Sequence, residues 1–388
     1  MVLPLWQRKK YTNNKHPNFQ SYLSNFFSSF LDFQTLSGYN IMNMYFYWRA
    51  IMKRLISLLL SAILCIMCLS SCSDKGDDGY YTHTQRDEKG RLSLYLSREA
   101  KDGTILEESA LKDIYTAACK KADATYALLS KNEDSSGVYE ANVSEGLVLD
   151  LDEKFIKELE RAFELSTLTG GLYQPAGGSL IKLFAENDLP DDAMIKEALS
   201  HTGTDKFSIG DNSVKKNDSK ALLDLYCYMD ARIIETVIEY LKETEVAYGS
   251  VTFNGIAGVF GKKPEGEAFK IDISDGTDAG IEGAFNITDG YVAFTSADFG
   301  THIDFSDGIR YNAVSRAAVY SPDAVTAAAV ANIAYASGTA PIKSLYENES
   351  FSFEAAIWDQ DGKITLTEKA ESASLYTPET TAPENGND

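Results

Sequence analysis

The stretch from Met52 to Cys72 decides which part of this chain can form a folded domain. It begins with a lysine and an arginine, continues with the apolar run Leu55–Leu69, and ends on two serines before the cysteine. A basic start, a short apolar core and small residues before a cysteine are typical of a bacterial lipoprotein signal. The apolar run is about 15 residues long, whereas a membrane-spanning helix needs about 20. We therefore predict a signal peptide over 52–71 and lipid attachment at Cys72, and we disfavour a spanning helix.

This interpretation divides the rest of the chain. Export signals stand at the N-terminus of a protein, so we interpret residues 1–51 as a non-native upstream extension and Met52 as the real start. Residues 72–80 would be the lipid anchor and a polar tether, and 81–375 the folded domain. Residues 376–388 contain Pro, Thr and acidic residues without an apolar anchor, and we expect a disordered tail there. The mature protein would be exported and held on a bacterial membrane in the cell envelope.

Charge excludes one class of partner. The 388-residue chain has a formal net charge of −21, and the part after Cys72 is more acidic still because residues 1–71 are net basic. Such a surface repels phosphates, so we expect no binding to nucleic acid. Two cysteines remain in the predicted domain, Cys119 and Cys227, and the sequence allows a disulfide between them without requiring one.

Hydrophobic periodicity indicates a mixture of helices and antiparallel strands. Apolar residues recur at helical spacing over 111–129, 155–163 and 222–242, and Gly170-Gly171 is expected to end the second of these helices. Ser321-Pro322-Asp323 is expected to cap an alanine-rich helix that runs to Ser337. Residues 269–273 alternate as a strand does, and 351–358 with 363–366 predict a hairpin. This mixture predicts an α+β fold.

Five segments, in order, carry a family resemblance. The most specific is FIKELERAFELSTLTGGLYQPAGGSLIKLF at residues 155–184. The other four are spaced along the chain between residues 128 and 338. They are LLSKNEDSSGVYEAN, LPDDAMIKEALSHTGTDKFSI, VTFNGIAGVFG and SPDAVTAAAVANIAYASG. Together these segments resemble the ApbE-type flavin transferases, which are FAD:protein FMN transferases.

The resemblance implies a fold and a reaction. The fold would be the ApbE-like α+β fold over 81–375, with helices packed on mixed or antiparallel sheets. Family members use magnesium and FAD to transfer FMN to a threonine of a client protein, releasing AMP. A divalent cation held by hard oxygen ligands would stabilise charge on the FAD pyrophosphate. FAD, Mg²⁺ and a client protein are therefore the cofactors and partner that the resemblance implies.

The family's metal ligands are only partly matched in this chain. The helix position that carries a metal-binding Asp in the family is Ala328 here, and the ligand four residues on is Asn332. Cys227 could offer its backbone carbonyl to the metal, whereas Asp224 and Asp230 are candidates for contact with the cofactor. Because a methyl group cannot coordinate a hard dication as a carboxylate does, we expect weak or absent binding of FAD and magnesium.

Other positions depart from the family pattern as well. Leu172, Tyr173 and Gln174 stand where an aromatic-Asp pair is expected, and are candidate cofactor contacts. Asn132 replaces a ring-contacting Tyr, and a functional loop after Tyr311 is missing. Bulky Tyr226 and Tyr228 stand where the family has small residues, and a structure would show whether they fill the pocket near Asp224.

The residues leave several functions open. We favour a membrane-anchored member of the transferase family that is catalytically impaired or inactive, without identified catalytic residues. An active transferase, a flavin-holding protein without turnover and an unrelated enzyme are other readings. The alternative from another class is a non-enzymatic acidic binding or scaffold protein at the cell surface.

Overall fold

The computed structural model describes residues 79–187, 189–274, 281–296, 303–372 and 375–378. These belong to one compact unit, Asp77–Asp388. The predicted upstream extension, signal peptide and lipid site at Cys72 lie outside the described residues, as do most of the tether and of the tail. No helix among the described residues is both long enough and apolar enough to cross a membrane.

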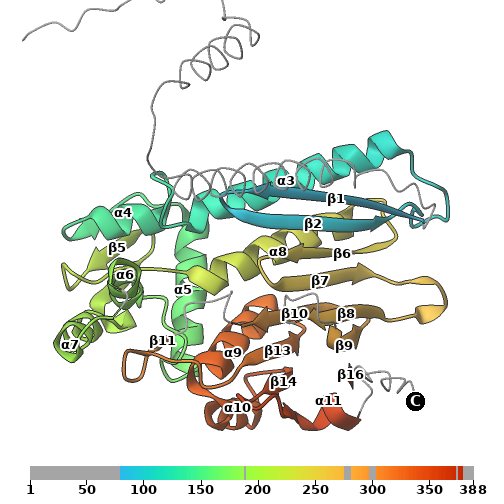
Figure 1. The fold of residues 1–388 in the computed structure, drawn as a ribbon. Coiled ribbons are helices and arrows are strands. Elements are labelled where there is room, and N and C mark those ends of the chain that lie inside the picture. Colours follow the sequence, from blue (N-terminus) through green and yellow to red (C-terminus); the bar gives the residue numbers. More distant parts are fainter. Residues whose placement is uncertain (1–78, 188, 275–280, 297–302, 373–374, 379–388) are drawn as a thin grey trace, which may run out of the picture. The chain divides into compact units, whose positions relative to one another are not determined.

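An antiparallel sheet of eight strands forms the centre of the unit, in the order β1-β2-β6-β7-β10-β13-β14-β15 (Figure 1). Successive side chains along each strand point alternately to an inner and an outer face of the sheet. They are β1 (Tyr80–Asp87), β2 (Gly90–Ser97), β6 (Tyr248–Phe253), β7 (Ile256–Gly261), β10 (Gly290–Thr295), β13 (Arg316–Ser321), β14 (Glu354–Trp358) and β15 (Ile364–Leu366).

Helices cover the inner face of this sheet and build the main core with it. They are α3 (Glu108–Leu129), α8 (Tyr226–Glu243) and α9 (Ala324–Ser337), and α5 (Glu153–Leu168) adds side chains to the same core. Helix α9 is buried on nearly every side, which its Ala-rich sequence permits because small side chains let neighbouring elements approach closely. Helix α8 packs against both α3 and α9, and α9 packs on β10 and β13.

A second, smaller apolar cluster lies on the outer face. It packs against a three-stranded antiparallel sheet in the order β16-β9-β8, made of β8 (Phe269–Ser274), β9 (Ile281–Ile287) and β16 (Tyr376–Pro378). The expected tail boundary at 376 is therefore too early. Tyr376 is buried against Phe285 and Trp358, so its aromatic ring keeps three further residues in the fold.

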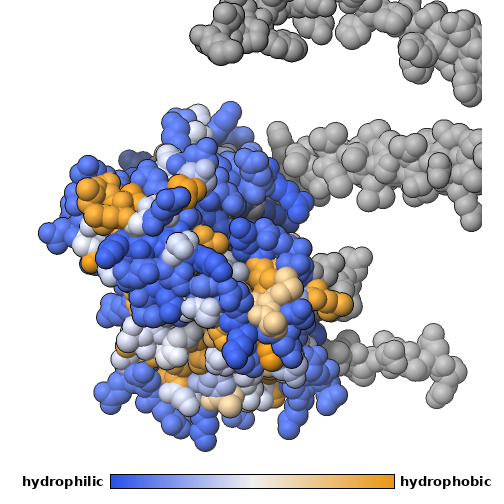
Figure 2. Space-filling model, turned by 90° about the vertical axis from the view of Figure 1, so that its left-hand side faces the viewer, coloured by the Kyte–Doolittle hydropathy of each residue, from blue (hydrophilic) through white to orange (hydrophobic). Residues whose placement is uncertain are grey.

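The remaining elements are short. Those before α8 are α4 (Gly137–Val143), β3 (Leu147–Val148), α6 (Gly178–Glu186), α7 (Asp192–Ser200), η1 (Thr204–Lys206), β4 (Phe207–Gly210) and β5 (Ser213–Lys216). Those after it are η2 (Pro264–Gly266), β11 (Ile303–Asp304), β12 (Ile309–Arg310), α10 (Thr339–Tyr346) and α11 (Glu368–Ser372). Figure 2 shows the side that carries α4, α6 and α7, which is mostly hydrophilic with small apolar patches.

The α+β class, the strand at 269–273 and the 359–362 hairpin are confirmed, and two helix starts are corrected. Helix α8 begins at Tyr226 rather than Leu222. The Leu222 carbonyl accepts a hydrogen bond from Gly178 N, 44 residues earlier in the chain, at 3.0 Å, instead of one from a following residue of the same helix. Asp323, not Ser321, caps α9 and accepts a hydrogen bond from Thr326 N at 2.6 Å. Ser321 is held in β13 by its pairing with β10.

Candidate functional site

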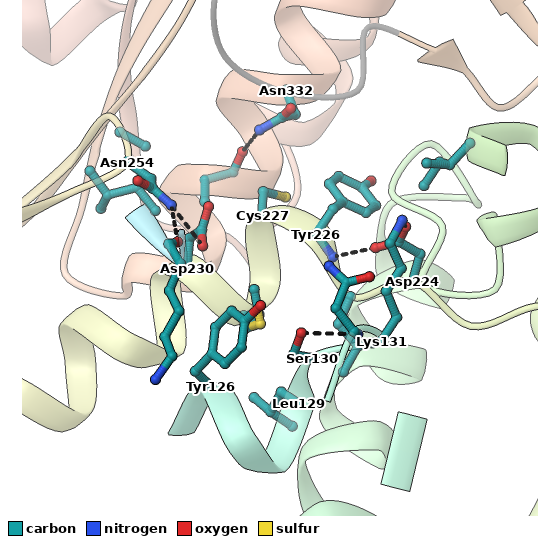
Figure 3. Close-up of a pocket in the computed structure, with 18 of the residues that line it drawn as sticks. Tyr126, Leu129, Ser130, Lys131, Asp224, Tyr226, Cys227, Asp230, Asn254 and Asn332 are labelled. Carbon is teal, nitrogen blue, oxygen red and sulfur yellow. Dashed lines mark hydrogen bonds and ion pairs between the residues drawn. The ribbon is translucent and has the colours of Figure 1, made fainter. Parts of the chain in front are cut away.

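A pocket of about 550 Å³ opens where the C-terminal end of α3 meets the N-terminal end of α8. Helix α9, the β6–β7 turn and β10 complete its walls (Figure 3). The lining mixes apolar side chains with amide, carboxylate and ammonium groups, as small-molecule pockets do. Its polar members are Glu88, Lys89, Ser130, Lys131, Asn132, Asp224, Asp230, Asn254, Thr295 and Asn332.

Asp224 is fixed in this pocket by the loop that delays the start of α8. Its backbone N–H donates to the Pro175 carbonyl at 2.8 Å, and its Oδ1 accepts from Tyr226 N at 3.1 Å. The other carboxylate oxygen forms an ion pair with the Lys131 ammonium. Only 5% of Asp224 is exposed, so the lysine supplies the positive charge that a buried carboxylate requires. An internal cation thus already neutralises one predicted cofactor contact.

Asp230 is the fifth residue of α8 and is the acid of the pocket whose pKa is most perturbed. Part of its side chain is open to the cavity, yet burial raises the pKa of Asp230 to about 7. The hydrogen bond that Asn254 Nδ2 donates at 3.3 Å acts in the opposite direction, and the nearby Asp224 carboxylate adds to the rise. Near neutral pH this group therefore exchanges a proton readily and carries only part of a negative charge.

The predicted metal ligands line the pocket but do not form a site suited to a hard dication. Ala328 contributes a methyl group, and Asn332 turns its Nδ2 back to donate to the Ala328 carbonyl at 2.9 Å. Cys227 is the second residue of α8, so its carbonyl is directed along the helix toward the amide four residues on. Within the described parts of the chain, no group of three His, Cys, Asp or Glu side chains could hold a metal ion.

The tyrosines of the α8 start divide between pocket and core. Tyr226 lines the pocket beside Asp224, whereas Tyr228 does not. The Tyr228 hydroxyl instead donates to Glu158 Oε2 at 2.6 Å in the core. Tyr173 lies behind Tyr226, with ring centroids 5.3 Å apart, and it is fully buried.

The aromatic-Asp position predicted to contact the cofactor therefore lies beneath the pocket. Neither Leu172 nor Gln174 is among the residues that line it, and the Gln174 side chain accepts from Ala176 N at 3.2 Å. The connection from β12 to β13 spans only residues 311–315, where the sequence indicated a missing loop.

Sequence reasoning missed the cationic groups of the pocket. Lys131 follows α3 directly, next to Asn132, and Lys89 lies in the β1–β2 turn with its Nζ 5.4 Å from the Tyr126 ring centroid. Lys89 also pairs with Asp123 at 2.6 Å. Lys131 stands inside a quoted family segment, but only the fold shows that it reaches Asp224, 93 residues away.

The comparisons with known proteins agree with this architecture. The model of the ApbE family matches residues 98–356. No curated protein sequence matches the chain. Among solved structures, the ApbE protein of Thermotoga maritima is 18% identical, with a TM-score of 0.64 over 76% of this chain and 98% of that one.

Two further structures give a similar picture. The flavin transferase ApbE of Vibrio cholerae is 16% identical, with a TM-score of 0.64 over 76% of this chain and 98% of its own. The apo form of the flavinyl transferase ApbE of Pseudomonas stutzeri is also 16% identical, with a TM-score of 0.64 over 77% of this chain and 98% of its own. The likeness to these structures establishes the fold. With the family match over most of the described residues, it follows that this chain belongs to the ApbE family.

Proposed function

We propose that this protein is a lipid-anchored member of the ApbE family at a bacterial cell envelope, in which FMN transfer from FAD to a client threonine is lost or strongly impaired. Anchoring is inferred from the signal pattern over 52–71 and from Cys72. Impairment is inferred from the pocket. The fold is that of a transferase family, and the pocket offers no cluster of acidic groups suited to a hard dication among the described residues.

The observation that carries the proposal is the wall formed by α9. Ala328 places a methyl group where the family resemblance implies a carboxylate, and it is 2% exposed at the pocket. A methyl group gives a hard dication neither charge nor a lone pair. Asp224 cannot compensate without giving up Lys131, since an ammonium already occupies its free oxygen. Losing one oriented electrostatic contact commonly costs about 2.7–4 kcal/mol of transition-state stabilisation.

A flavin-transfer assay tests the proposal. The protein from Ser73 onward, which contains the whole compact unit, is incubated with FAD, Mg²⁺ and a protein carrying a family-type acceptor threonine. Covalent FMN is read as in-gel fluorescence, with an active flavin transferase as positive control. We expect no labelling above background. Labelling within about ten-fold of the active enzyme would refute the proposal.

Restoring the carboxylate gives a second arm that does not depend on turnover. Ala328→Asp is expected to create Mg²⁺ binding that calorimetry detects, while Ala328→Leu, of similar size but without oxygen, is not. Circular dichroism checks that both variants fold. A wild-type protein that binds Mg²⁺ as tightly as Ala328→Asp would contradict our reading of α9.

A flavin titration separates the alternative class. A non-enzymatic acidic binding or scaffold protein would show no change in flavin fluorescence with FAD or FMN at any accessible concentration. A degenerate transferase would retain weak flavin binding in the pocket lined by Tyr126 and Tyr226.

A further inference from the structure

A second hollow, of about 1080 Å³, lies on the outer face of the central sheet. Strands β1, β2, β6 and β7 form its floor, and β8 borders it. It shares the lining residues Glu88, Lys89, Asn254, Ile256 and Phe294 with the candidate pocket, so the two spaces adjoin each other. We call this hollow the outer groove. It is larger than most small-molecule pockets.

Two arginines face each other at one end of the outer groove. Arg86 and Arg91 are directly paired across the β1–β2 hairpin, and both are exposed. Like charges in this arrangement are unfavourable. Neither guanidinium has an ion pair or side-chain hydrogen bond within the described part of the chain. Two uncompensated cations on the same face of a hairpin form a site for an anion, and they stand out in a chain of net charge −21.

The other charges of the groove leave this site open. Asp87 accepts hydrogen bonds from Gln85 Nε2 and Lys89 N, and Asp272 pairs with Lys270 at 3.0 Å. The Lys89 ammonium is engaged with Asp123. Glu88 also lines the groove, and its carboxylate forms no ion pair or hydrogen bond with another described residue, so it is the one groove acid that would oppose an anion.

The border of the groove is a strand edge. Strand β8 is at the end of its sheet and pairs only with β9 among the described residues. Its Ile271, Asp272 and Ile273 line the groove. A strand edge offers unpaired backbone N–H and C=O groups, and an extended peptide satisfies them by adding a strand. The six residues of β8 match a segment of about 20 Å.

Hydroxyl groups complete the floor between the edge and the arginines. Ser93 and Thr252 line the groove and are paired across β2 and β6. Thr84 of β1, outside the lining, is paired with Ser93, and its Oγ1 is 2.9 Å from Ser93 Oγ. Such a row offers further donors and acceptors to a polar chain, and it does not suit the apolar occupant that a bare sheet face would attract.

We propose that the outer groove binds an extended acidic segment of a partner protein, with its backbone along β8 and a carboxylate between Arg86 and Arg91. The bound segment would lie next to the candidate pocket, because the two spaces share lining residues. This inference concerns the chemistry of a partner protein and not flavin transfer itself. It is compatible with an active pocket and with an inactive one.

Peptide binding without flavin tests the proposal, so its failure would leave the flavin-transfer result untouched. The probe is a fluorescein-labelled peptide of about ten residues in which glutamate alternates with valine, measured by anisotropy at low and high salt. We expect saturable binding that weakens with salt, and no binding of the same peptide with lysine for glutamate. Equal binding of both peptides would overturn the proposal.

Variants locate the anion site. Replacing both arginines, Arg86→Ser with Arg91→Ser, should weaken binding by on the order of ten-fold or more. The control Arg310→Ser removes an exposed arginine of β12 that does not line the groove, and should change binding by less than about two-fold. Unchanged binding in the double variant would refute the assignment. Thermal melting checks its fold, which should not be weakened because a like-charge pair is removed.

Backbone chemistry tests the strand edge. Edge pairing uses the N–H groups of alternate residues only. Methylating one set of alternate amides in the probe should abolish binding, whereas methylating the other set should spare it. Equal effects of the two would mean that β8 is not used. A version of the protein ending at Pro378 should bind equally well, and a ten-fold gain in affinity would show that the acidic tail is the true occupant.

Discussion

Replacing Glu235 with glutamine is expected to destabilise the protein by about 3 kcal/mol. Glu235 is on α8 and only 6% of it is exposed. Its Oε1 accepts from Ala324 N, the first residue of α9, at 3.0 Å. Its Oε2 accepts from Arg161 of α5 at 3.2 Å and from Arg232 of α8. One carboxylate therefore joins the helices that carry the pocket residues of α8 and α9.

The size of the destabilisation follows because an uncharged amide cannot accept hydrogen bonds from both guanidinium groups as the carboxylate does. Glutamine of the same shape can keep one oxygen on Ala324 N, but its NH₂ group then faces two guanidinium groups. Two charge-assisted bonds are lost, each of which contributes about 1.5–3 kcal/mol. The loss is partly offset because Arg161 keeps Asp323 and Arg232 keeps Glu158. The net cost is therefore about 3 kcal/mol, at the lower end of the range for breaking a buried pair.

Urea unfolding followed by circular dichroism measures this effect without screening the charges by salt. The matched control is Glu239→Gln, which changes an exposed glutamate one turn along the same helix and should cost less than about 0.5 kcal/mol. If Glu235→Gln stays within about 1 kcal/mol of the wild type, the network does not hold α5, α8 and α9 together as described.

Three further predictions concern single groups. The Asp218 and Glu197 carboxylates accept hydrogen bonds from the His201 ring and raise the pKa of His201 above 6.5. The stabilising effect of this group is therefore full below that pH and is lost as pH rises through the folded value. His201→Asn should lower the melting temperature at pH 6 more than at pH 9. Burial raises the pKa of Asp230 to about 7. Ionisation of this carboxyl group therefore lowers the stability of the folded protein as pH rises from about 4 to 7. Asp230→Asn should raise the melting temperature at pH 8 but not at pH 4. The buried Tyr173 hydroxyl has no hydrogen-bond partner among the described residues, whereas the Tyr228 hydroxyl donates to Glu158. In the same urea assay, Tyr173→Phe should leave stability unchanged or raise it by about 1 kcal/mol, and Tyr228→Phe should lower it by about 1–3 kcal/mol. The opposite order of the two variants would contradict both assignments.

The spacing of apolar residues and the positions of turn residues predicted several helices, strands and turns of this fold. The helical spacing over 111–129 and 155–163 falls within α3 and α5, and the hairpin around 359–362 follows from turn residues such as Gly362, whose φ is +79°. The starts of α8 and α9 were displaced because contacts from distant segments overrode local preference. Leu222 is held by Gly178, and Ser321 by its place in β13. Such contacts leave no trace in a periodicity.

The sequence alone determined the family, the acidic charge and the presence of a methyl side chain at Ala328, because collinear motifs and residue identities are properties of the chain itself. Tertiary structure decided which groups meet. It placed Lys131 on Asp224, sent Tyr228 to the core and Tyr226 to the pocket, and set Arg86 opposite Arg91 beside the edge of β8. These pairings depend on how helices and strands far apart in the chain pack, and packing is fixed by complementary surfaces that no single segment contains.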